Sequence, residues 1–227
     1  MQPYLFPYIG YFQLINVVDK FIIFDDVNYI NKGWVNRNRI LLNHKDYLFT
    51  IPLKAVSQNK LIKETEVDEG DKWRNKLLKT FEAAYSKAPY FKQVFPIISE
   101  ILNNKEANLS TYILNSIKQV ANYLEIKTEI VTSSERYGNQ HLKGEDRIID
   151  ICLQEKADEY VNPIGGLELY TREKFEEKGL KLFFLKTHPI EYAQFGKPFV
   201  PWLSIIDLLM FCSGDELRSF LEKQELI

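Results

Sequence analysis

Short apolar runs and amphipathic segments alternate along the chain. Apolar runs that end in polar residues predict buried strands, which we expect at 20–25, 127–132, 159–162 and 180–185. Apolar residues three and four positions apart predict helices, which we expect at 9–19, 71–85, 94–102, 109–124, 145–156, 171–178, 204–211 and 215–223. Because helices and strands alternate at both ends of the chain, the pattern indicates a layered α/β fold.

The block 36–67 has a different pattern. Its runs 37–42 and 47–53 flank the polar tetrapeptide 43–46 and predict a β-hairpin, with a further strand at 61–67. We therefore expect a small antiparallel insertion at about 36–67, followed by a helical region at about 70–125. No repeat or low-complexity linker interrupts the chain, so we expect a single domain over 1–227.

Composition restricts the class of protein. The 227 residues carry a net charge of −2 and are 45% hydrophobic, as in ordinary globular proteins. This balance gives no bulk signature of DNA or membrane binding, and no apolar run has the length of a membrane span. The two cysteines, Cys152 and Cys212, lie in apolar helical contexts and are interpreted as buried thiols of a reducing compartment. We expect a cytoplasmic location without membrane insertion.

The segment 2–13 is unusually rich in proline and aromatic residues. Pro3 and Pro7 restrict the backbone, and helical spacing begins after Pro7, so a rigid loop is expected to lead into a helix. Helix N-termini can hold anions, which favours a ligand pocket here. The alternative is an aromatic loop that packs into the core. The candidate pocket residues are Gln2, Tyr4, Gly10 and Tyr11.

Two acids end the first predicted strand. Ligands in open α/β sheets bind beyond the carboxyl ends of the strands, so Asp25 and Asp26 are candidate catalytic residues. Adjacent residues of an extended chain point to opposite sides, and at most one of the two should face a given site. The alternative is a turn at the strand end, with Asp26 as a capping residue.

A basic loop follows at 31–39. Arginine and lysine bind phosphate or carboxylate by charge-assisted hydrogen bonds, and a tryptophan could stack on a base or sugar ring. The alternative is a solvated loop that enters a strand. Arg37 is a candidate catalytic residue, and the candidate binding residues are Tyr29, Lys32, Trp34, Asn36 and Arg39.

Further candidates lie in the second half of the chain. Asn162, Gly165 and Gly166 follow a predicted strand, where paired glycines could form an anion nest or a plain turn. His141 lies in a polar loop and is the best candidate for acid–base catalysis, although a surface histidine is the alternative. His44 is expected to be solvated and His188 stays undecided. The histidines and cysteines lack metal-ligand spacing, so we expect no metal site built from them. Ser204 and Asp207 have the Ser-x-x-Asp spacing of a helix start.

Several of these segments, taken together, resemble the WbqC-like protein family. They are QPYLFPYIGYFQLI, DKFIIFDDVNYINKGWVNRNRI, KAPYF and FVPWLSIIDLLM, which occur in that order over nearly the whole chain. The resemblance implies a transferase that adds an aminoacyl group, such as glycyl, to a nucleotide-linked amino sugar in O-antigen or other surface polysaccharide biosynthesis. The alternative is a non-catalytic nucleotide-sugar binding or scaffold protein.

The resemblance also implies a fold and a chemistry. We expect a mostly parallel, Rossmann-like sheet similar to that of nucleotidyltransferases, with ATP and Mg²⁺ used to adenylate the aminoacyl donor. Family members carry a short apolar strand just before the Gln-Pro pair, so this first strand is expected to be absent here, and an upstream start is the simpler explanation. The opening segment would shape the nucleotide or acyl pocket, the basic loop would bind phosphates, Asp25 or Asp26 would bind the amine or Mg²⁺, and His141 would act as the base.

Overall fold

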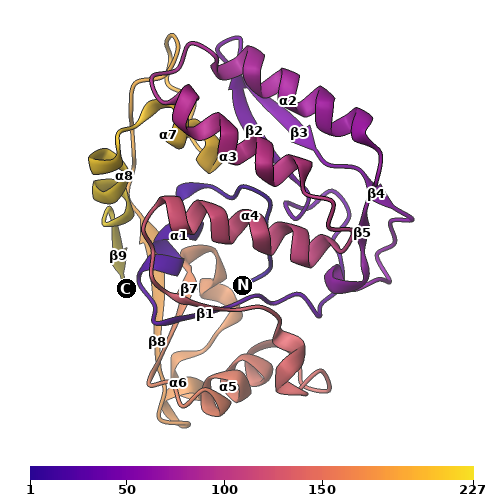
Figure 1. Cartoon of the computed structure of the whole chain (residues 1–227). Helices are drawn as coiled ribbons and strands as arrows, with labels where there is room; N and C mark the ends of the chain where they lie inside the picture. Colours follow the sequence, from indigo (N-terminus) through magenta and orange to yellow (C-terminus); the bar gives the residue numbers. More distant parts are fainter.

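The computed structural model describes residues 1–227 and has a mixed α/β fold (Figure 1). Its strands form four small sheets of two or three strands each. β1 (Lys20–Ile22) pairs in parallel with β6 (Glu129–Val131). β7 (Glu159–Pro163) and β8 (Lys181–Thr187) form a second parallel pair. The mixed α/β class and parallel pairing are therefore confirmed, whereas a continuous Rossmann-like layer stays a prediction.

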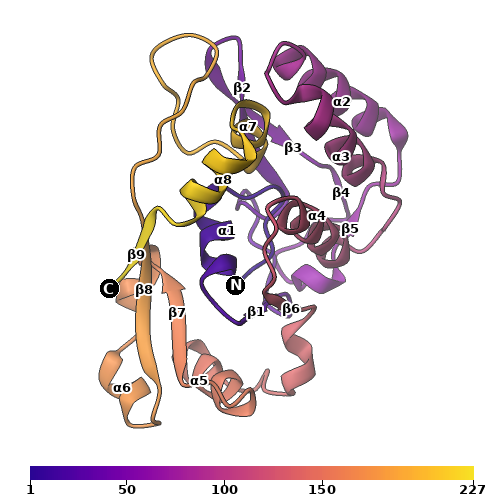
Figure 2. The same ribbon diagram turned by 60° about the vertical axis from the view of Figure 1, so that its left-hand side comes forward.

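A groove of about 780 Å³ lies between the two parallel pairs and is lined by residues of β1, β7 and α5 (Gly144–Gln154). Figure 2 shows β1 and β7 as separate strands. Met1 lies along β1, where its carbonyl oxygen accepts the N–H of Phe24 at 2.8 Å.

The antiparallel insertion begins with a hairpin. β2 (Arg37–Leu42) pairs with β3 (Lys45–Thr50), and the two connecting residues, Asn43 and His44, have φ angles of 51° and 62°. Two successive left-handed residues are typical of the type I′ turn, whose twist matches that of a hairpin. The hairpin is therefore confirmed, with its second strand beginning two residues earlier than predicted.

The rest of the insertion is less regular than expected. β4 (Leu53–Lys54) pairs with β5 (Glu66–Val67) in an antiparallel ladder. The strand predicted at 61–67 is wrong for most of its length, because Ile62–Glu64 forms a short 3-10 turn, η1. Residue Ile62 is fully buried there, which explains the apolar signal without a strand.

The helical middle region consists of α2 (Asp71–Tyr85), α3 (Phe91–Asn103) and α4 (Leu109–Tyr123). The bounds predicted for the first and third of these helices agree to within one residue. The side chain of Asn108 caps α4 by accepting the N–H of Thr111 at 3.1 Å. Periodicity over at least thirteen residues is the strongest local signal of a helix, which explains the agreement.

The remaining elements lie in the second half of the chain. They are η2 (Ser134–Tyr137), η3 (Ile164–Leu169), α6 (Arg172–Glu176), α7 (Ile205–Phe211), α8 (Gly214–Leu221) and β9 (Gln224–Leu226). The strand β9 was not predicted, because its three residues are half-exposed and pair only with β8, which is distant in sequence.

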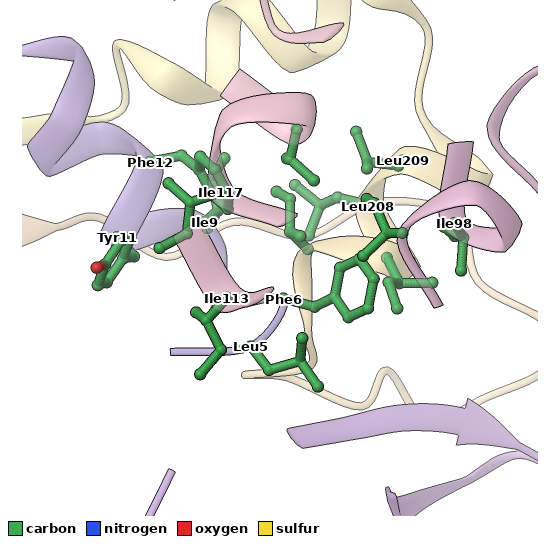
Figure 3. Packing of buried hydrophobic residues seen from close by; sticks show 14 of the residues in the cluster. Leu5, Phe6, Ile9, Tyr11, Phe12, Ile98, Ile113, Ile117, Leu208 and Leu209 are labelled. Atoms are coloured by element: carbon green, nitrogen blue, oxygen red, sulfur yellow. The ribbon is translucent and has the colours of Figure 1, made fainter. Parts of the chain in front are cut away.

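The largest core cluster contains 46 buried residues, and α1 (Ile9–Asn16) and the loop before it contribute strongly to it. Figure 3 shows Leu5 and Phe6 from this loop among side chains of α3, α4 and α7, such as Ile113 and Leu208. Leu5 and Phe6 are both fully buried. The opening segment therefore forms a loop that packs into the core, as one of its two predicted alternatives requires.

Hydrogen bonds join this opening loop to β2 and to α7. Asn38 Nδ2 donates to the carbonyl oxygen of Phe6 at 2.8 Å, and Ser204 Oγ donates to the same oxygen at 2.8 Å. The N–H of Ile205 donates to the carbonyl oxygen of Pro7 at 3.0 Å. Buried carbonyl groups outside regular structure need such partners, so three distant segments are held together at one point.

The helix start predicted from Ser204 and Asp207 is confirmed at α7, although only Ser204 acts as a cap. Ser204 caps the helix, since its Oγ accepts the N–H of Ile206 at 3.2 Å. Asp207 does not reach back to Ser204, whose N–H donates instead to the carbonyl oxygen of Arg39 at 2.8 Å. Asp207 is fully buried and accepts hydrogen bonds from the hydroxyl groups of Tyr85 and Tyr192, each at 2.7 Å.

Candidate functional site

The acids that follow β1 lie inside the protein. Asp25 is 3% exposed, and its two carboxylate oxygens accept hydrogen bonds at 2.7 Å from the hydroxyl groups of Ser110 and Ser133. Ser133 follows β6, which runs parallel to β1, so the carboxyl ends of both strands meet here as the α/β rule predicts. Both oxygens of Asp25 are thus already engaged by the protein.

Asp26 is the centre of a second buried network. Arg147 of α5 donates to one of its oxygens at 2.5 Å, Gln140 donates to the same oxygen at 3.1 Å, and Ser134 donates to the other. Burial opposes ionisation of Asp26, but the hydrogen bonds from Ser134 and Arg147 outweigh it and hold the pKa below its usual value. Asp26 is therefore a paired structural carboxylate.

This donor set does not suit Mg²⁺. The ion needs free oxygen ligands in a near-octahedral arrangement, whereas the oxygens of Asp25 and Asp26 already accept hydrogen bonds and the guanidinium of Arg147 lies against Asp26. No group of three or more histidine, cysteine, aspartate or glutamate side chains in the structure is arranged to hold a metal ion. Asp25 and Asp26 therefore do not fit a Mg²⁺ site.

The basic loop lies on the outer face of the β2–β3 hairpin. Side chains alternate across a strand, so Arg37 and Arg39 project outward while Asn38 and Ile40 are buried. Both guanidinium groups lie over the ring of Trp34, at 5.5 and 5.6 Å from its centroid. Trp34 is 46% exposed. The structure thus brings the catalytic candidate Arg37 and the binding candidates Trp34 and Arg39 into one surface cluster.

Other residues of the basic loop shape the backbone. Arg37 Nε donates to the carbonyl oxygen of Gly33 at 2.7 Å, and the guanidinium also donates to that of Lys32. Lys32 is exposed and has a φ of 60°. Tyr29 and Asn36 are buried, and the Tyr29 hydroxyl donates to Asn36 Oδ1 at 2.8 Å. These last two side chains are in the core and do not face a ligand.

The predicted pocket residues of the opening segment have structural contacts. Tyr11 is 2% exposed, and its hydroxyl donates to the carbonyl oxygen of Gln2 at 3.0 Å. Tyr4 packs against it, with the ring centroids 5.9 Å apart. Gly10 has no free space, because an added Cβ would lie 2.4 Å from a ring carbon of Tyr8. Gly10 therefore allows the ring of Tyr8 to fold over the start of α1.

Tyr8 lines a pocket of about 490 Å³ between the start of α1 and the two loops around 187–192 and 198–203. This volume is typical of sites for small organic ligands. Trp202 stands at its edge, 60% exposed, with its ring centroid 6.0 Å from that of Tyr8. The other polar or aromatic side chains of the wall are Thr187, His188, Glu191, Tyr192 and Phe199.

The pocket and the basic cluster are linked by direct contacts. A guanidinium nitrogen of Arg39 lies 3.4 Å from the carbonyl oxygen of Trp202, and another lies 3.3 Å from Asp46. Trp34, Arg39, Trp202 and Tyr8 thus form a continuous series, which we call the aromatic–arginine surface. It combines exposed aromatic rings, fixed cations and an adjoining pocket, and it is the candidate functional site.

The glycine pair after β7 lies in a turn, which is the second of the two alternatives predicted for it. Neither Gly165 nor Gly166 has a positive φ, so the backbone lacks the right-handed and left-handed alternation of an anion nest. They lie in η3, and an added Cβ on Gly166 would be 1.8 Å from Asn162 Nδ2. Gly166 therefore makes room for the side chain of Asn162, which is 9% exposed.

The histidines separate into three environments. His141 is exposed in the loop after η2 and makes no side-chain hydrogen bond. His44 is exposed but has Nδ1 2.8 Å from the carbonyl oxygen of Phe195. His188 lines the 490 Å³ pocket. Burial raises the pKa of both Cys152 and Cys212 to about 12, so neither thiol is a ready nucleophile.

Sequence reasoning missed the pocket because its walls come from opposite ends of the chain. Tyr8 lies inside the opening segment but is not among the residues predicted to form a pocket, and Trp202 lies two residues before the predicted helix start at Ser204. The available signal was a tryptophan in a proline-rich loop, flanked by Pro201 and close to His188 and Tyr192. Nothing in the spacing indicated that this loop would contact Tyr8.

One family model and one curated relative match nearly the whole chain. The model of the WbqC-like protein family matches residues 2–219. The chain is 31% identical over 225 residues to the uncharacterized protein Rv1507c of Mycobacterium tuberculosis (strain ATCC 25618 / H37Rv). The aligned region covers 97% of this chain and 95% of that protein. No solved structure matches. None of the helices combines the length and the apolar character needed to cross a bilayer. The chain therefore belongs to the WbqC-like protein family.

Proposed function

We propose that the chain transfers an aminoacyl group, such as glycyl, to the amino group of a nucleotide-linked sugar in surface polysaccharide biosynthesis. The observation that carries this proposal is the continuous contact from Trp34 through Arg39 to Trp202 and Tyr8, next to a pocket of about 490 Å³. The cytoplasmic location and the glycine donor stay predictions from the sequence and the family resemblance.

The aromatic–arginine surface has the groups that such a ligand needs. Arginine recognises phosphate oxygens by charge-assisted hydrogen bonds, and the guanidinium groups of Arg37 and Arg39 flank Trp34. An exposed indole ring provides a face for a nucleobase. We place the base at Trp34, the pyrophosphate at the arginines and the sugar in the pocket between Tyr8 and Trp202.

The chemistry requires an activated acyl group and a free amine. Glycine and ATP would form glycyl adenylate and release pyrophosphate. The sugar amine would then attack the acyl carbon, the amide bond would form, AMP would leave, and the amine would lose a proton. Among the pocket side chains, His188 and Glu191 are the groups that can accept a proton from the amine as a general base. They replace His141 as the preferred base in this proposal.

The experiment supplies purified protein with ATP and Mg²⁺, glycine and an amino-sugar nucleotide, and follows AMP and the amide product by mass spectrometry. We expect both products to form, and we expect His188→Ala to lose most of the activity while the exposed His141→Ala keeps it. Loss with His141→Ala and not with His188→Ala would place the base outside the pocket. Formation of neither AMP nor amide by the folded wild-type protein would contradict adenylation.

A non-catalytic nucleotide-sugar binding protein is the second candidate. The observation that favours it is the engagement of Asp25 and Asp26 in internal hydrogen bonds, which leaves the strand-end acids without a free carboxylate oxygen for catalysis. A ligand that binds only the folded state raises its apparent stability. A thermal shift with amino-sugar nucleotides that is lost in Trp202→Ala, without any turnover, would identify this second function.

A further inference from the structure

β3 is an edge strand with a free side. It pairs only with β2, in a register where Leu42 faces Lys45 across the two-residue turn. The antiparallel pattern then directs the N–H and C=O groups of Asp46, Leu48 and Thr50 away from β2. No backbone or side-chain group of the protein bonds to them. An unpaired edge of this kind is a template for another extended chain.

Most side chains of β3 are exposed to solvent. All residues of β3 except Phe49 are exposed, and Tyr47 and Leu48 are 37% and 46% exposed. Phe49 packs against Phe81 of α2, with the ring centroids 5.1 Å apart, and so fixes the helix over one face of the hairpin. Figures 1 and 2 show α2 beside the hairpin.

A basic hollow of about 790 Å³ lies between this face and α2. Three lysines of the helix line it, together with Asn43 and Tyr47 of the hairpin, and no carboxylate does. None of the three lysines forms an ion pair, and the nearby Asp71 is engaged by Lys105 and Arg74. The lysine row consists of Lys72, Lys76 and Lys79.

The spacing of the lysine row fits an extended acidic chain. At 1.5 Å per residue, successive lysines are about 6 and 4.5 Å apart along the helix axis, because they are four and three positions apart. Alternate side chains of a strand are about 6.8 Å apart and point to one face. A strand added to β3 would therefore direct every second side chain toward the row.

We propose that the free edge of β3 and the lysine row of α2 form a docking site for an acidic, extended segment of a partner protein. The backbone of the segment would pair with Asp46, Leu48 and Thr50, and its alternate glutamate or aspartate side chains would meet the three lysines. Main-chain pairing provides affinity in this mode of recognition, and side-chain pockets provide selectivity. The basic hollow and the pocket of Tyr8 and Trp202 share no lining residue.

The test uses a fluorescein-labelled peptide, Glu-Thr-Glu-Thr-Glu-Thr-Glu with blocked ends, and measures its binding to the whole protein by anisotropy. We expect saturable binding that weakens as salt rises, because the contacts involve exposed charges. The same peptide with lysine in place of glutamate should not bind. The triple variant Lys72→Glu/Lys76→Glu/Lys79→Glu should bind the acidic peptide at least about tenfold more weakly.

Two further variants separate the parts of the proposal. The control changes three exposed lysines that lie outside the basic hollow and form no ion pair, namely Lys92, Lys118 and Lys178. The triple variant Lys92→Glu/Lys118→Glu/Lys178→Glu changes the net charge by the same amount and should bind the peptide as the wild type does. Leu48→Pro removes one outward N–H without removing a bond of the ladder and should also weaken binding by about tenfold. Circular dichroism verifies that each variant is folded.

Three outcomes would overturn the proposal. Equal binding to the Lys72 triple variant would exclude the lysine row. Unchanged binding to Leu48→Pro, with full competition by inorganic triphosphate, would show a small-anion site without strand pairing. Dimerisation of the protein through β3, seen by ultracentrifugation and unaffected by the lysine changes, would show that a second copy occupies the edge.

Discussion

Arg147 of α5 donates a 2.5 Å hydrogen bond to the carboxylate of Asp26, which lies 121 residues earlier in the chain. Both side chains are almost inaccessible to solvent. Removing one partner of a buried ion pair leaves the other charge without compensation and costs about 3 kcal/mol or more. We expect Asp26→Asn to lower the free energy of unfolding in urea by this amount. Asp26→Leu combined with Arg147→Met should recover most of the loss, and a double variant as unstable as the single one would contradict the argument.

The pair of Asp26 and Arg147 also makes the free energy of unfolding depend on pH in the acid range. The pKa of Asp26 is lowered in the folded state, so its contribution is present above the unfolded value of about 3.9 and is lost as the pH falls through the folded pKa. The difference in unfolding free energy between wild type and Asp26→Asn should therefore shrink below about pH 4. A difference that stays constant down to pH 2 would show that Asp26 is not held ionised by Arg147.

Asp207 should have the opposite dependence on pH. Burial raises its pKa, although hydrogen bonds from Tyr192 and Tyr85 oppose this. A carboxyl group with a raised folded pKa contributes stability below its unfolded pKa of about 3.9, and this is lost as the pH rises through the folded pKa. The stability of wild type relative to Asp207→Asn should thus fall above about pH 4. Tyr192→Phe removes one donor and should raise the folded pKa further, so that this fall, measured by urea unfolding at a series of pH values, extends to higher pH and becomes larger.

Asn36 and Trp34 should have separable roles although they are two positions apart. Asn36 is buried, accepts from the Tyr29 hydroxyl and donates to the carbonyl oxygen of Ile51 at 2.8 Å. Asn36→Ala should cost about 2 kcal/mol of stability, since it leaves buried groups unpaired. Trp34→Ala should leave stability nearly unchanged and weaken binding of an amino-sugar nucleotide by about tenfold or more. Calorimetry of both variants separates the two effects.

Gly10 should control the position of Tyr8. An alanine there would place its Cβ 2.4 Å from the ring of Tyr8, so the ring must move from the pocket wall. Gly10→Ala should destabilise the protein by about 1–3 kcal/mol and weaken ligand binding. In the background of Tyr8→Ala the same change should have little effect, because the clash is gone. Additive effects in this double-mutant cycle would show that Gly10 acts independently of Tyr8.

Local signals explain which parts of the fold were predictable. The bounds of α2 follow from the periodicity of its apolar residues, and the β2–β3 hairpin follows from the turn residues between its strands. In both cases the residues that give the signal are close together in sequence. The turn predicted at 43–46 was found at Asn43–His44. Strand order was not predictable in the same way, because it depends on partners that are distant in sequence. The pairing of β1 with β6 joins segments more than 100 residues apart.

The candidate site was predictable only in part, for a related reason. The cluster of Trp34, Arg37 and Arg39 is local, and alternation along β2 places the arginines on its outer face. The partner of Asp26 is on α5, and no sequence pattern linked the two. The pocket has Tyr8 on one wall and Trp202 on another. Residue types alone therefore identified cationic and aromatic candidates, but they could not separate the side chains that lie in the core from those that lie at the surface.

The joining of the opening loop to α7 has a consequence for how the protein is made. Phe6 depends on Ser204 for a hydrogen bond across 198 residues, and Gln13 donates to the carbonyl oxygen of Phe220 across 207. Contacts of such long sequence separation form late and slow the approach to the native state. The side of α1 that packs on α8 therefore stays uncovered during synthesis until α8 has been made, whereas the side that packs on α4 can be covered earlier.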